Sequence, residues 1–418
     1  MNLASVEPSR DKSIVVPKPI DGSSGRWLTV VSHLDPRYGG LSSVVPQLSS
    51  RLAADHHLHI DLAAFLDAGE LYSASSYPEL AISEWPTRRG QWTLNRARRE
   101  RFRELVKAAN GLHIHGLWEQ STAIAAPSAR ALRKPYILSA HGMLESWALA
   151  NKRLKKQLYA ALFERGNVCG AACLHALTSA EAQDYRRFGC RTPIAVIPNG
   201  VAVPATVDAE PFHSQFPTLK GKRIVLFLGR IHFKKGLDLL IQAWSDLSPT
   251  HPDAHLVLAG PDFEGTRAVM EKLVAEKCLT GSVTFTGMLR HDLKWSALAA
   301  AECFVLPSYS EGLSVSALEA MGVGLPVIVT EQCNLPAVKD LHAGWQIQSE
   351  VGQLTSAIRE LLSNAPGTNA RIGSRGRNLV LTRYNWSTVS EQMAELYRWV
   401  QGGPLPSNVD LVTDRGRA

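Results

Sequence analysis

The stretch that decides the fold is FVLPSYSEGLSVSALEAMGVGLPVI, residues Phe304–Ile328. Its apolar start predicts a strand that ends at Pro307, and a polar loop containing Glu311 and Gly312 leads into a helical run that ends at Gly322. The first amides of a helix have no partner inside it, so they suit a phosphate or the hydroxyl groups of a sugar. Glycine at position 312 lets a ligand approach the backbone closely. The stretch therefore predicts a ligand-binding strand–loop–helix unit.

Two carboxylates in this stretch, Glu311 and Glu319, are eight residues apart. Along a helix they would be separated by about 10–12 Å, at ~1.5 Å per residue. That is too far to flank one scissile bond as a hydrolase pair does. We expect them to hold separate hydroxyl groups of an extended ligand. The alternative is that Glu311 is a helix-start charge and Glu319 a surface residue.

Outward from this stretch, apolar runs alternate with helical patterns in two similar halves. The strands predicted in the first half are Trp27–Ser32, His59–Leu66, Leu112–His115, Pro135–Ala140, Ala171–Leu177 and Ile194–Ile197. The helices predicted there are Leu41–Ala54, Asn95–Ala109, Thr122–Leu132 and Leu154–Glu164. In the second half, the predicted strands are Arg223–Leu228, His255–Ala259, Val283–Thr286, Cys303–Leu306 and Pro326–Val329. The helices predicted between them are Leu237–Leu247, Thr266–Lys277, Asp292–Ala301 and Ser314–Met321. This alternation indicates an α/β fold with two doubly wound, Rossmann-like parallel sheets.

A polar, Pro-rich segment, residues 204–220, separates the halves and is predicted to be a linker. We expect an N-terminal domain over residues 26–203 and a C-terminal domain over residues 221–385. Because ligands bind at the carboxyl ends of parallel strands, the two facing domains predict a cleft between them. An amphipathic helix is predicted over residues 386–400.

The composition excludes several classes of protein. The 418 residues carry 45 Lys+Arg and 38 Asp+Glu, for a formal net charge of +7, and 45% of them are hydrophobic. These values exclude a disordered chain, a collagen-like fibre and a disulfide-held miniprotein. Six cysteines lack zinc-ligand spacing and are expected to be reduced thiols of a cytoplasmic protein. No window approaches the ~18 apolar residues of a spanning helix, and the polar residues 1–25 and 402–418 are expected to be flexible tails.

The segment GRIHFKKG, residues 229–236, places cations at the carboxyl end of a predicted strand. Arg230 ends the strand and Lys235 opens the next helix, a combination that favours a pyrophosphate clamp. It matches neither a P-loop nor a Gly-x-Gly-x-x-Gly fingerprint, and a solvated basic loop is the alternative. In the first half, Gly39 and Gly40 occupy the corresponding loop and would allow the backbone close to a phosphate or sugar.

Histidines follow two neighbouring strands of the first half. His141 comes directly after a strand and could hydrogen-bond a substrate hydroxyl or stabilise charge. His113, His115 and Trp118 lie on and after the preceding strand, where His115 and Trp118 are candidates for an acceptor pocket with an aromatic platform for a sugar. Taken singly, each histidine is better explained as a satisfied structural residue.

Residues 88–107 contain eight Lys and Arg residues and only two acidic ones, with Trp85 and Trp92 beside or among them. Basic residues with interfacial tryptophans suit an anionic membrane surface. The alternatives are a nucleic-acid site and a solvated helix face.

Together these motifs resemble glycosyltransferase family 4, the retaining group 1 nucleotide-sugar transferases with the GT-B fold. The resemblance covers the chain from Trp27 to about Val400. It rests on the Glu-x7-Glu motif, GRIHFKKG, the Gly39-Gly40 loop, the segment HGM at His141, and IPNGV at residues 197–201. Ala202 stands where the family usually has an acidic residue.

The resemblance assigns a role to each candidate in the second half. Arg230 and Lys235 would bind the donor diphosphate, and Glu319 the ribose hydroxyls. The donor sugar would be bound by Glu311 and by the amides of Gly312, Leu313 and Ser314.

In the first half, the family pattern implies that Gly40 approaches the diphosphate or the sugar, and that His141 contacts the transferred sugar near the reacting centre. The terminal helix around Trp386 would cross back onto the N-terminal domain. No Asp-x-Asp metal motif is apparent beside these groups, so we expect no cofactor, and cations in place of a divalent metal.

The function implied is transfer of a hexose from a UDP- or GDP-sugar to a saccharide or lipid-linked acceptor, with retention. Exopolysaccharide or lipopolysaccharide assembly at the inner face of the bacterial cytoplasmic membrane is the expected pathway, with residues 88–107 against the membrane and no nucleic-acid partner. One alternative is a sugar-nucleotide epimerase on the same fold. The other is a non-catalytic, basic nucleic-acid-binding protein.

Overall fold

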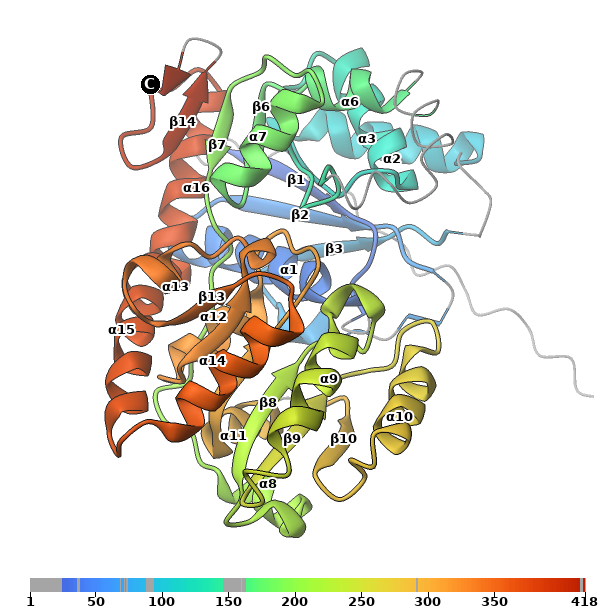
Figure 1. Ribbon diagram of the computed structural model, residues 1–418. Coiled ribbons are helices and arrows are strands. Elements are labelled where there is room, and N and C mark those ends of the chain that lie inside the picture. Colours follow the sequence, from blue (N-terminus) through green and yellow to red (C-terminus); the bar gives the residue numbers. More distant parts are fainter. Residues whose placement is uncertain are drawn as a thin grey trace, which may run out of the picture.

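A computed structural model of the chain describes residues 25–35, 38–67, 69–70, 72, 74–87, 94–145, 159, 163–290, 292–413 and 416–417. Two α/β domains, each built on a parallel sheet, lie one above the other (Figure 1). This confirms the predicted fold class.

The N-terminal sheet contains the strands β1 (Arg26–Val31), β2 (His59–Ala64), β3 (Ala81–Glu84), β4 (Gly111–His115), β5 (Tyr136–Ser139), β6 (Cys173–Ala176) and β7 (Ile194–Val196). They lie in the order β7-β6-β5-β4-β1-β2-β3 and all pair in parallel. The helical elements of this domain are α1 (Gly40–His56), η2 (Ala74–Ser76), α2 (Arg96–Ala108), α3 (Gln120–Ala131), α6 (Arg165–Cys169) and α7 (Ser179–Arg187). The predicted helix 154–164 lies mostly outside the described residues.

The C-terminal sheet contains β8 (Arg223–Leu228), β9 (Ala254–Ala259), β10 (Val283–Gly287), β11 (Ala301–Leu306), β12 (Val327–Thr330) and β13 (Gly344–Ile347), in the order β10-β9-β8-β11-β12-β13. The helical elements before β11 are α8 (Glu210–Gln215), η4 (Pro217–Leu219), η5 (Phe233–Lys235), α9 (Leu237–Leu247), α10 (Thr266–Glu276) and α11 (Asp292–Ala300). After it come α12 (Val315–Gly322), η6 (Glu331–Cys333), α13 (Ala337–Asp340), α14 (Val351–Ser363) and α15 (Thr368–Arg383). The strands read as continuous apolar runs because helices cover both faces of the sheet.

Both sheets have the same switch in strand order. In each, the first strand lies between its sequence successor and a strand that returns on its other side: β1 lies between β2 and β4, and β8 between β9 and β11. The loops that leave such a strand pair diverge to opposite faces and open a crevice at the carboxyl ends. The predicted site residues follow these strands.

The last helix, α16 (Trp386–Val400), returns to the N-terminal domain (Figure 1). Its apolar face joins the core cluster that contains Trp27, and Tyr397 stacks on Trp27 at 3.7 Å between ring centroids. An aromatic pair of this kind is worth about 0.5–1.5 kcal/mol beyond its buried area. A Cβ on Gly200 would lie 2.5 Å from the indole of Trp386, so the glycine of IPNGV lets the returning chain pass over this segment.

The prediction of a flexible C-terminal tail is wrong. Two further strands, β14 (Asp410–Thr413) and β15 (Gly416–Arg417), extend the N-terminal sheet, and β14 pairs antiparallel with β7. Leu411 is 2% exposed. The two apolar residues Val409 and Leu411 bury against the sheet edge, which the polar composition of the surrounding segment conceals.

The predicted linker, residues 204–220, is also partly wrong. Within it, α8 and η4 pack into the C-terminal domain, where Phe212 and Leu219 are fully buried. Pro211 stands in the first turn of α8, where proline is favoured. Two of the prolines that suggested a linker, Pro211 and Pro217, thus stand at the start of short helices.

The expectation of six reduced thiols is wrong for one pair. Cys169, at the end of α6, forms a disulfide with Cys190, which follows α7. Cys173, Cys303 and Cys333 are free thiols buried in the two cores. Because the two half-cystines belong to different helical segments, the sequence spacing alone did not pair them.

Candidate active site

Lys235 and Glu311 form an ion pair at the carboxyl ends of β8 and β11. The ammonium group of Lys235 bonds Oε1 of Glu311, and the hydroxyl of Ser308 donates to the same oxygen over 2.8 Å. The two charged side chains are largely buried, at 15% and 12% exposure. Since β8 and β11 are neighbours, the residues that follow them meet at one edge of the sheet.

The loops that carry this pair are fixed by local geometry. Gly236 has φ +67°, and a Cβ there would lie 2.0 Å from the carbonyl oxygen of Pro307. The amide of Tyr309 donates to the carbonyl of Lys234 over 2.8 Å, and its hydroxyl donates to Asp238 over 2.8 Å. The loop after β11 is therefore bonded to the loop after β8.

Arg230 is a further cation at this edge of the sheet, besides Lys235 and its neighbour Lys234. Its guanidinium lies 4.8 Å from the centre of the Phe263 ring. From the other domain, Gly39 approaches it so closely that a Cβ would stand 3.2 Å from Nε of Arg230. A Cβ on Gly40 would lie 3.9 Å from the side chain of Val315 at the start of α12. The structure thus places both predicted glycines against the C-terminal domain.

The electrostatics of the cluster favour an anion. Burial opposes the ionisation of Glu311, but the charges of Lys235 and Lys234 and the hydrogen bonds together outweigh it and lower the pKa of this carboxyl. Burial lowers the pKa of Arg230 and of Lys234, against the opposing effect of nearby carboxylates. Arg230, Lys234 and Lys235 form a concentration of positive charge that suits a diphosphate.

The rest of the Glu-x7-Glu segment starts α12. Ser314 is the N-cap residue, and its hydroxyl accepts from the amide of Ala317 over 3.2 Å. Leu313 is buried beside it. Glu319 lies within α12, whereas Glu311 lies in the preceding loop, and the carboxylate of Glu319 bonds Nζ of Lys294 on α11 over 2.6 Å. Glu319 has its own cation partner and does not share the one of Glu311.

The two domains touch at two glycines. A Cβ on Gly142 would lie 2.9 Å from Cα of Gly312, and a Cβ on Gly312 would lie 3.2 Å from the amide nitrogen of Gly142. Beside them, the hydroxyl of Ser310 donates to Oε2 of Glu145 across the cleft. The turn that follows β5 is therefore in contact with the Glu311–Ser314 loop.

His141 stands in this turn with φ +52°, a left-handed conformation that non-glycine residues seldom adopt. The turn is held by the buried carboxylate of Glu181, which accepts from the amide of Gly142 over 2.6 Å, and by Tyr185, whose hydroxyl accepts from the amide of Ala140 over 2.7 Å. Burial, and then the charge of His175, lower the pKa of His141 to about 3. The imidazole is neutral at physiological pH.

His115 is 2% exposed, and its Nδ1 lies 2.9 Å from Nε2 of His141. His115, which we expected to line the acceptor pocket, is thus in direct contact with His141. Burial lowers the pKa of His115 well below its usual value, so both rings are neutral. One of the two nitrogens therefore carries a proton and donates it to the other in a hydrogen bond. The contact orients the ring of His141.

A directed chain of hydrogen bonds lies behind these two rings. Nε2 of His175 faces the carbonyl oxygen of Ile197 at 2.8 Å and must donate, so its Nδ1 accepts from the hydroxyl of Ser139 at 2.6 Å. Ser139 then accepts from Nε2 of His113, whose Nδ1 accepts from the hydroxyl of Tyr397 at 2.8 Å. The chain joins β4, β5 and β6 to the returning helix α16, and it makes His113 structural.

Trp118 is half-buried, with φ +64°. Its amide donates to Glu164 over 2.8 Å, and its indole nitrogen donates to the carbonyl of Met143 over 3.3 Å. The neighbouring carboxyl of Glu119 accepts from Ser32, and burial raises its pKa. These groups follow β1 and β4, beside the switch in strand order of the N-terminal sheet.

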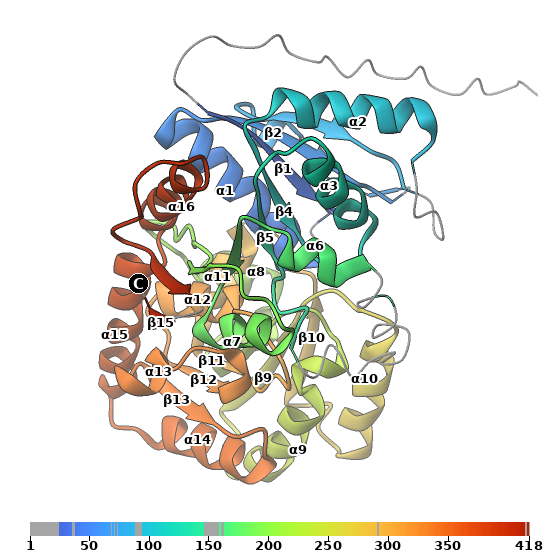
Figure 2. The same cartoon turned by 90° about the horizontal axis from the view of Figure 1, so that it is seen from above.

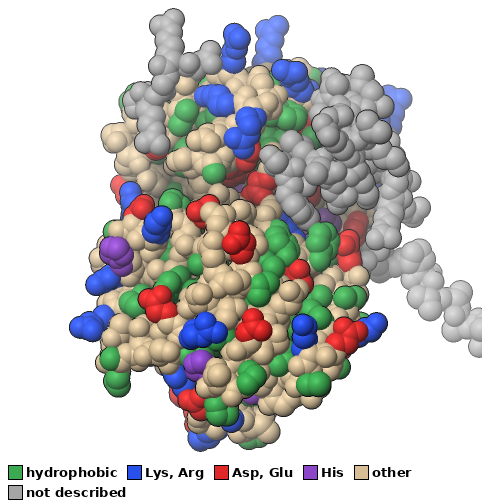
Figure 3. Space-filling model, in the orientation of Figure 1, with side chains coloured by type: hydrophobic (Ala, Val, Ile, Leu, Met, Phe, Trp, Pro, Cys, Tyr) green, Lys and Arg blue, Asp and Glu red, His purple; other side chains and the backbone are tan. Residues whose placement is uncertain are grey.

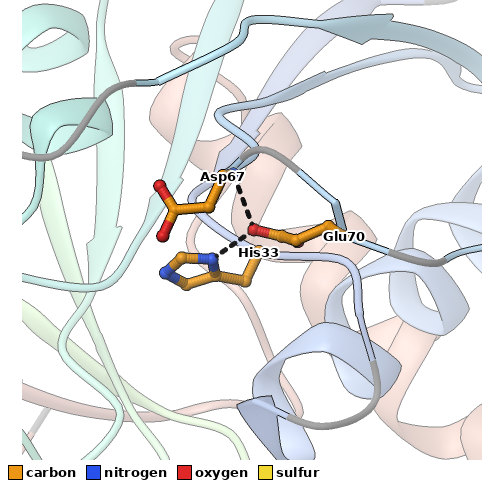
Figure 4. A group of neighbouring side chains, drawn as sticks. All are labelled: His33, Asp67 and Glu70. Carbon is orange, nitrogen blue, oxygen red and sulfur yellow. Dashed lines mark hydrogen bonds and ion pairs between the residues drawn. The ribbon is translucent and has the colours of Figure 1, made fainter.

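His33, Asp67 and Glu70 lie together after β1 and β2 (Figure 4). Glu70 bonds Nδ1 of His33 at 2.7 Å and accepts from the amides of Leu34, Asp35 and Asp67 at 3.1, 3.3 and 2.8 Å. The carboxylate is occupied by these donors, so the group braces the loop that leads to Gly39.

The basic segment is only partly as predicted. Helix α2 lies on the outer side of the N-terminal domain (Figure 2), with Phe102, Leu105 and Val106 buried beneath it. In the space-filling view, Lys and Arg side chains gather on the end of the molecule formed by this domain (Figure 3). Trp85, however, is 2% exposed and packs against Phe65 and Phe102, so the prediction that it is interfacial is wrong. Residues 88–93, including Trp92, lie outside the described residues.

Several residues of the site were not predicted. Lys234, Glu145 and Ser310 lie at the contact between the domains, and Lys294 pairs with Glu319. Lys234 stands within the quoted GRIHFKKG motif, and Glu145 follows the HGM motif by one residue. Their positions beside known motifs were a signal, whereas the Ser310–Glu145 contact depends on how the domains meet.

Two family models match the chain in tandem, one in each domain. The model described as "Glycosyl transferase 4-like domain" matches residues 39–200, and the one described as "Glycosyl transferases group 1" matches residues 208–379. The C-terminal domain thus matches the group 1 glycosyl transferases, and the N-terminal domain matches a glycosyl transferase 4-like domain.

Curated glycosyltransferases match part of the chain. Alpha-D-kanosaminyltransferase from Streptomyces kanamyceticus is 29% identical over 182 residues, which are 43% of this chain and 46% of the relative. D-inositol 3-phosphate glycosyltransferase from Mycobacterium bovis is 30% identical over 182 residues, which are 42% of this chain and 37% of the relative. The chain thus spans less than half the length of these relatives.

Solved structures with the same fold match nearly all of this chain. Sucrose-phosphate synthase from Thermosynechococcus elongatus aligns with a TM-score of 0.71 at 22% identity, covering 90% of this chain and 99% of that one. Anabaena HepE, solved in complex with UDP and glucose, aligns with a TM-score of 0.73 at 17% identity, covering 90% and 100%. These likenesses establish the GT-B architecture.

Proposed function

We propose that the protein transfers a hexosyl group from a nucleoside diphosphate sugar to a hydroxyl group of a saccharide or lipid-linked acceptor, with retention of configuration, as in glycosyltransferase family 4. The observation that carries the proposal is the meeting of Arg230, Lys234, Lys235 and Glu311 with the Gly39–Gly40 loop of the other domain. This is a cationic site walled by backbone, which matches a diphosphate that enters between two domains. HepE, which shares this fold, was solved with UDP and glucose, so UDP-sugars are the first donors to test.

The cations act on the leaving group. When the bond between the anomeric carbon and the diphosphate breaks, negative charge develops on the diphosphate oxygen. Arg230 and Lys235 stand at this edge before the reaction and would stabilise the charge as it develops. Lys235 would exchange part of its contact with Glu311 for the phosphate, and Glu311 would then accept from a sugar hydroxyl. We propose that the carboxylate of Glu319 accepts hydrogen bonds from the ribose hydroxyl groups. These hydroxyl groups would compete with Lys294 for that carboxylate.

The neutral His141 acts as a hydrogen-bonding group and not as an acid. With a pKa of about 3 it lacks, at neutral pH, the second ring proton that a general acid would donate. We propose that it hydrogen-bonds the transferred sugar as positive charge grows at the anomeric carbon, and that His115 keeps its ring in place. The acceptor proton moves to a diphosphate oxygen as the new glycosidic bond forms on the same face. The amides of Gly312, Leu313 and Ser314 complete the sugar site.

The N-terminal domain is proposed to bind the acceptor. Trp118, next to the Glu119 carboxyl, offers an aromatic face and a hydrogen-bond acceptor. The basic side chains of α2 would hold the protein to anionic lipid at the inner face of the cytoplasmic membrane, for assembly of a lipid-linked polysaccharide. Among the described residues, no helix is long and apolar enough to cross a bilayer. Loss of binding to anionic vesicles when Arg96, Arg98, Arg99 and Arg103 become Glu tests this arm.

The test of the function is a donor screen. Thermal shifts are measured with UDP, GDP, UDP-glucose, UDP-galactose, UDP-N-acetylglucosamine and GDP-mannose, since a ligand at a hundred times its Kd adds about 2.7 kcal/mol to stability. A UDP or GDP series should stabilise the wild type and not Arg230→Ala/Lys235→Ala. Product analysis then follows, with and without bacterial lipid extract as the source of acceptor.

A glycosyl product that appears only with the extract supports transfer. Epimerised free sugar from the donor alone would replace the proposal with an epimerase. If no nucleotide or nucleotide sugar shifts the melting temperature, the proposed function fails.

A further inference from the structure

Glu145 lies in the same turn as His141, and its side chain contacts the opposite domain. Its amide donates to the carbonyl of Gly142 over 3.3 Å, which fixes its backbone in the turn. Its Oε2 accepts from the hydroxyl of Ser310 in the opposite domain, and its charge interacts with that of Lys234. Nothing in the Glu-x7-Glu, GRIHFKKG or HGM motifs accounts for a third carboxylate at this place.

The second oxygen of the Glu145 carboxylate, Oε1, is buried and accepts no hydrogen bond from the described residues. Leaving a buried polar atom without a hydrogen-bond partner destabilises the protein, and more so when the group is charged. Burial also raises the pKa of Glu145, although Ser310 and Lys234 act against it. A carboxylate kept in this state is suited to a ligand that brings a donor.

The surroundings of Oε1 define that ligand. Oε1 of Glu145 and the amide nitrogen of Gly312 each lie 3.0 Å from the point where a Cβ on Gly142 would stand. Position 142 has no room for a side chain, and a hydrogen-bond acceptor and a backbone amide thus lie near each other where Gly142 meets Gly312. A hydroxyl group both donates and accepts, so it can satisfy the two at once. A phosphate oxygen would be repelled by the carboxylate.

We propose that Glu145 is a ligand for one hydroxyl group of the transferred sugar and selects the donor by that hydroxyl. The inference rests on the proposed function and deepens it. Glu311 and Glu145 approach the sugar from opposite domains, so the sugar hydroxyl would be bound fully only when the cleft is closed. Specificity and closure would then depend on the same contact.

The alternative is that Glu145 only ties the domains together through Ser310. The two possibilities differ in what they do to a nucleotide without a sugar. A tie between domains affects UDP and a UDP-sugar alike, whereas a sugar ligand affects the UDP-sugar alone. Ser310→Ala is the matched control, because it removes the interdomain hydrogen bond and leaves the carboxylate.

The experiment compares the wild type with Glu145→Ala, Glu145→Gln and Ser310→Ala. Binding of UDP or GDP alone and of the donor found in the screen is measured by calorimetry, and kcat/KM is measured with that donor and its monodeoxy analogues. Unchanged circular dichroism and melting temperatures of the variants establish that they fold, and Glu145→Gln, which keeps the shape of the side chain, serves where Glu145→Ala does not.

We expect Glu145→Ala to weaken donor binding about 100-fold and to leave the affinity for the free nucleotide within about twofold. One monodeoxy donor should lose about 100-fold in kcat/KM with the wild type and with Ser310→Ala, but less than about threefold with Glu145→Ala. Equal losses for nucleotide and donor, or a deoxy penalty that Glu145→Ala retains, would overturn the inference. If the wild type binds no nucleotide sugar, it is the proposed function that fails.

Discussion

Gly39 and Arg230 belong to different domains, yet a Cβ on Gly39 would stand 3.2 Å from Nε of Arg230. Gly39 has φ +101° and is the N-cap residue of α1. The loop can therefore approach the guanidinium only because it ends in a residue that has no side chain and tolerates this conformation. This pair places the start of an N-terminal helix next to the cations of the C-terminal domain.

The first prediction concerns Gly39→Ala. The added methyl group displaces Arg230 and strains the backbone by about 1–2 kcal/mol, so we expect binding of UDP or GDP to weaken at least about tenfold. Calorimetry measures this. Gly402→Ala is the control, because Gly402 has φ +95° and a Cβ there meets no described atom within 4 Å. Wild-type nucleotide affinity in Gly39→Ala would contradict the role of the loop.

The second prediction separates stability from function at the Lys235–Glu311 pair. Lys235→Met alone leaves a buried carboxylate without its main partner, and we expect it to lower the free energy of unfolding by about 3 kcal/mol. Lys235→Met/Glu311→Gln replaces both charges and should recover most of that loss, but should still bind donor at least about 100-fold more weakly than the wild type. Urea unfolding and calorimetry measure the two effects.

The matched control is the pair formed by Arg223 and Glu302, at 2.6 Å, at the opposite ends of the same two strands. Arg223→Met/Glu302→Gln should change stability without changing donor affinity. Donor affinity that follows stability in all of these variants would mean that the Lys235–Glu311 pair is merely structural.

The sequence predicted the strands and α-helices between Arg223 and Val329 to within two residues, and the reason is burial, whereas α13, α14 and α15 were not predicted. Strand β8, for example, was predicted as Arg223–Leu228 and observed at the same bounds, because a strand buried on both faces must be apolar throughout. The edge strands β3 and β13 were missed, since a strand with one free edge carries polar residues and resembles a loop. For the same reason the sequence did not reveal β14.

The position of a candidate site residue could be predicted where it depends only on the strand that the residue follows. Arg230, Lys235 and Glu311 were placed correctly at neighbouring strand ends, because the topology of a doubly wound sheet brings such positions together. The contacts of Glu145 with Ser310 depend on the relative placement of two domains, which no local pattern encodes. Trp85 failed similarly, since only its packing with Phe65 and Phe102 distinguishes a core tryptophan from an interfacial one.

The third prediction concerns divalent metal ions. Because Arg230, Lys234 and Lys235 already provide positive charge at the proposed diphosphate site, we expect transfer to continue at more than about half its rate after dialysis against EDTA. The measurement is product formation with and without added Mg²⁺ or Mn²⁺. A loss of about tenfold or more that Mn²⁺ restores would assign part of the charge to a metal ion.

The fourth prediction follows from the buried histidines. Burial lowers the pKa of His175 to about 4, whereas an unfolded histidine titrates near 6.5. Between these values the unfolded chain binds a proton that the folded chain does not. The free energy of unfolding therefore rises with pH in this window. Below about pH 6.5 this contribution to stability decreases by up to ~1.4 kcal/mol per pH unit.

A buried carboxyl acts in the opposite direction, so the histidine contribution must be isolated by a variant. Burial raises the pKa of Glu181 to about 7, and its folded form retains a proton that the unfolded form loses. His175→Gln removes one titrating imidazole and leaves Glu181, so its unfolding free energy should fall less steeply than that of the wild type between pH 6.5 and 5. The control is His342→Asn, because His342 is exposed and asparagine tolerates its left-handed backbone, and this variant should give the wild-type slope. Urea unfolding at half-unit pH steps measures these slopes, and parallel curves for His175→Gln and the wild type would mean that His175 is protonated in the folded protein.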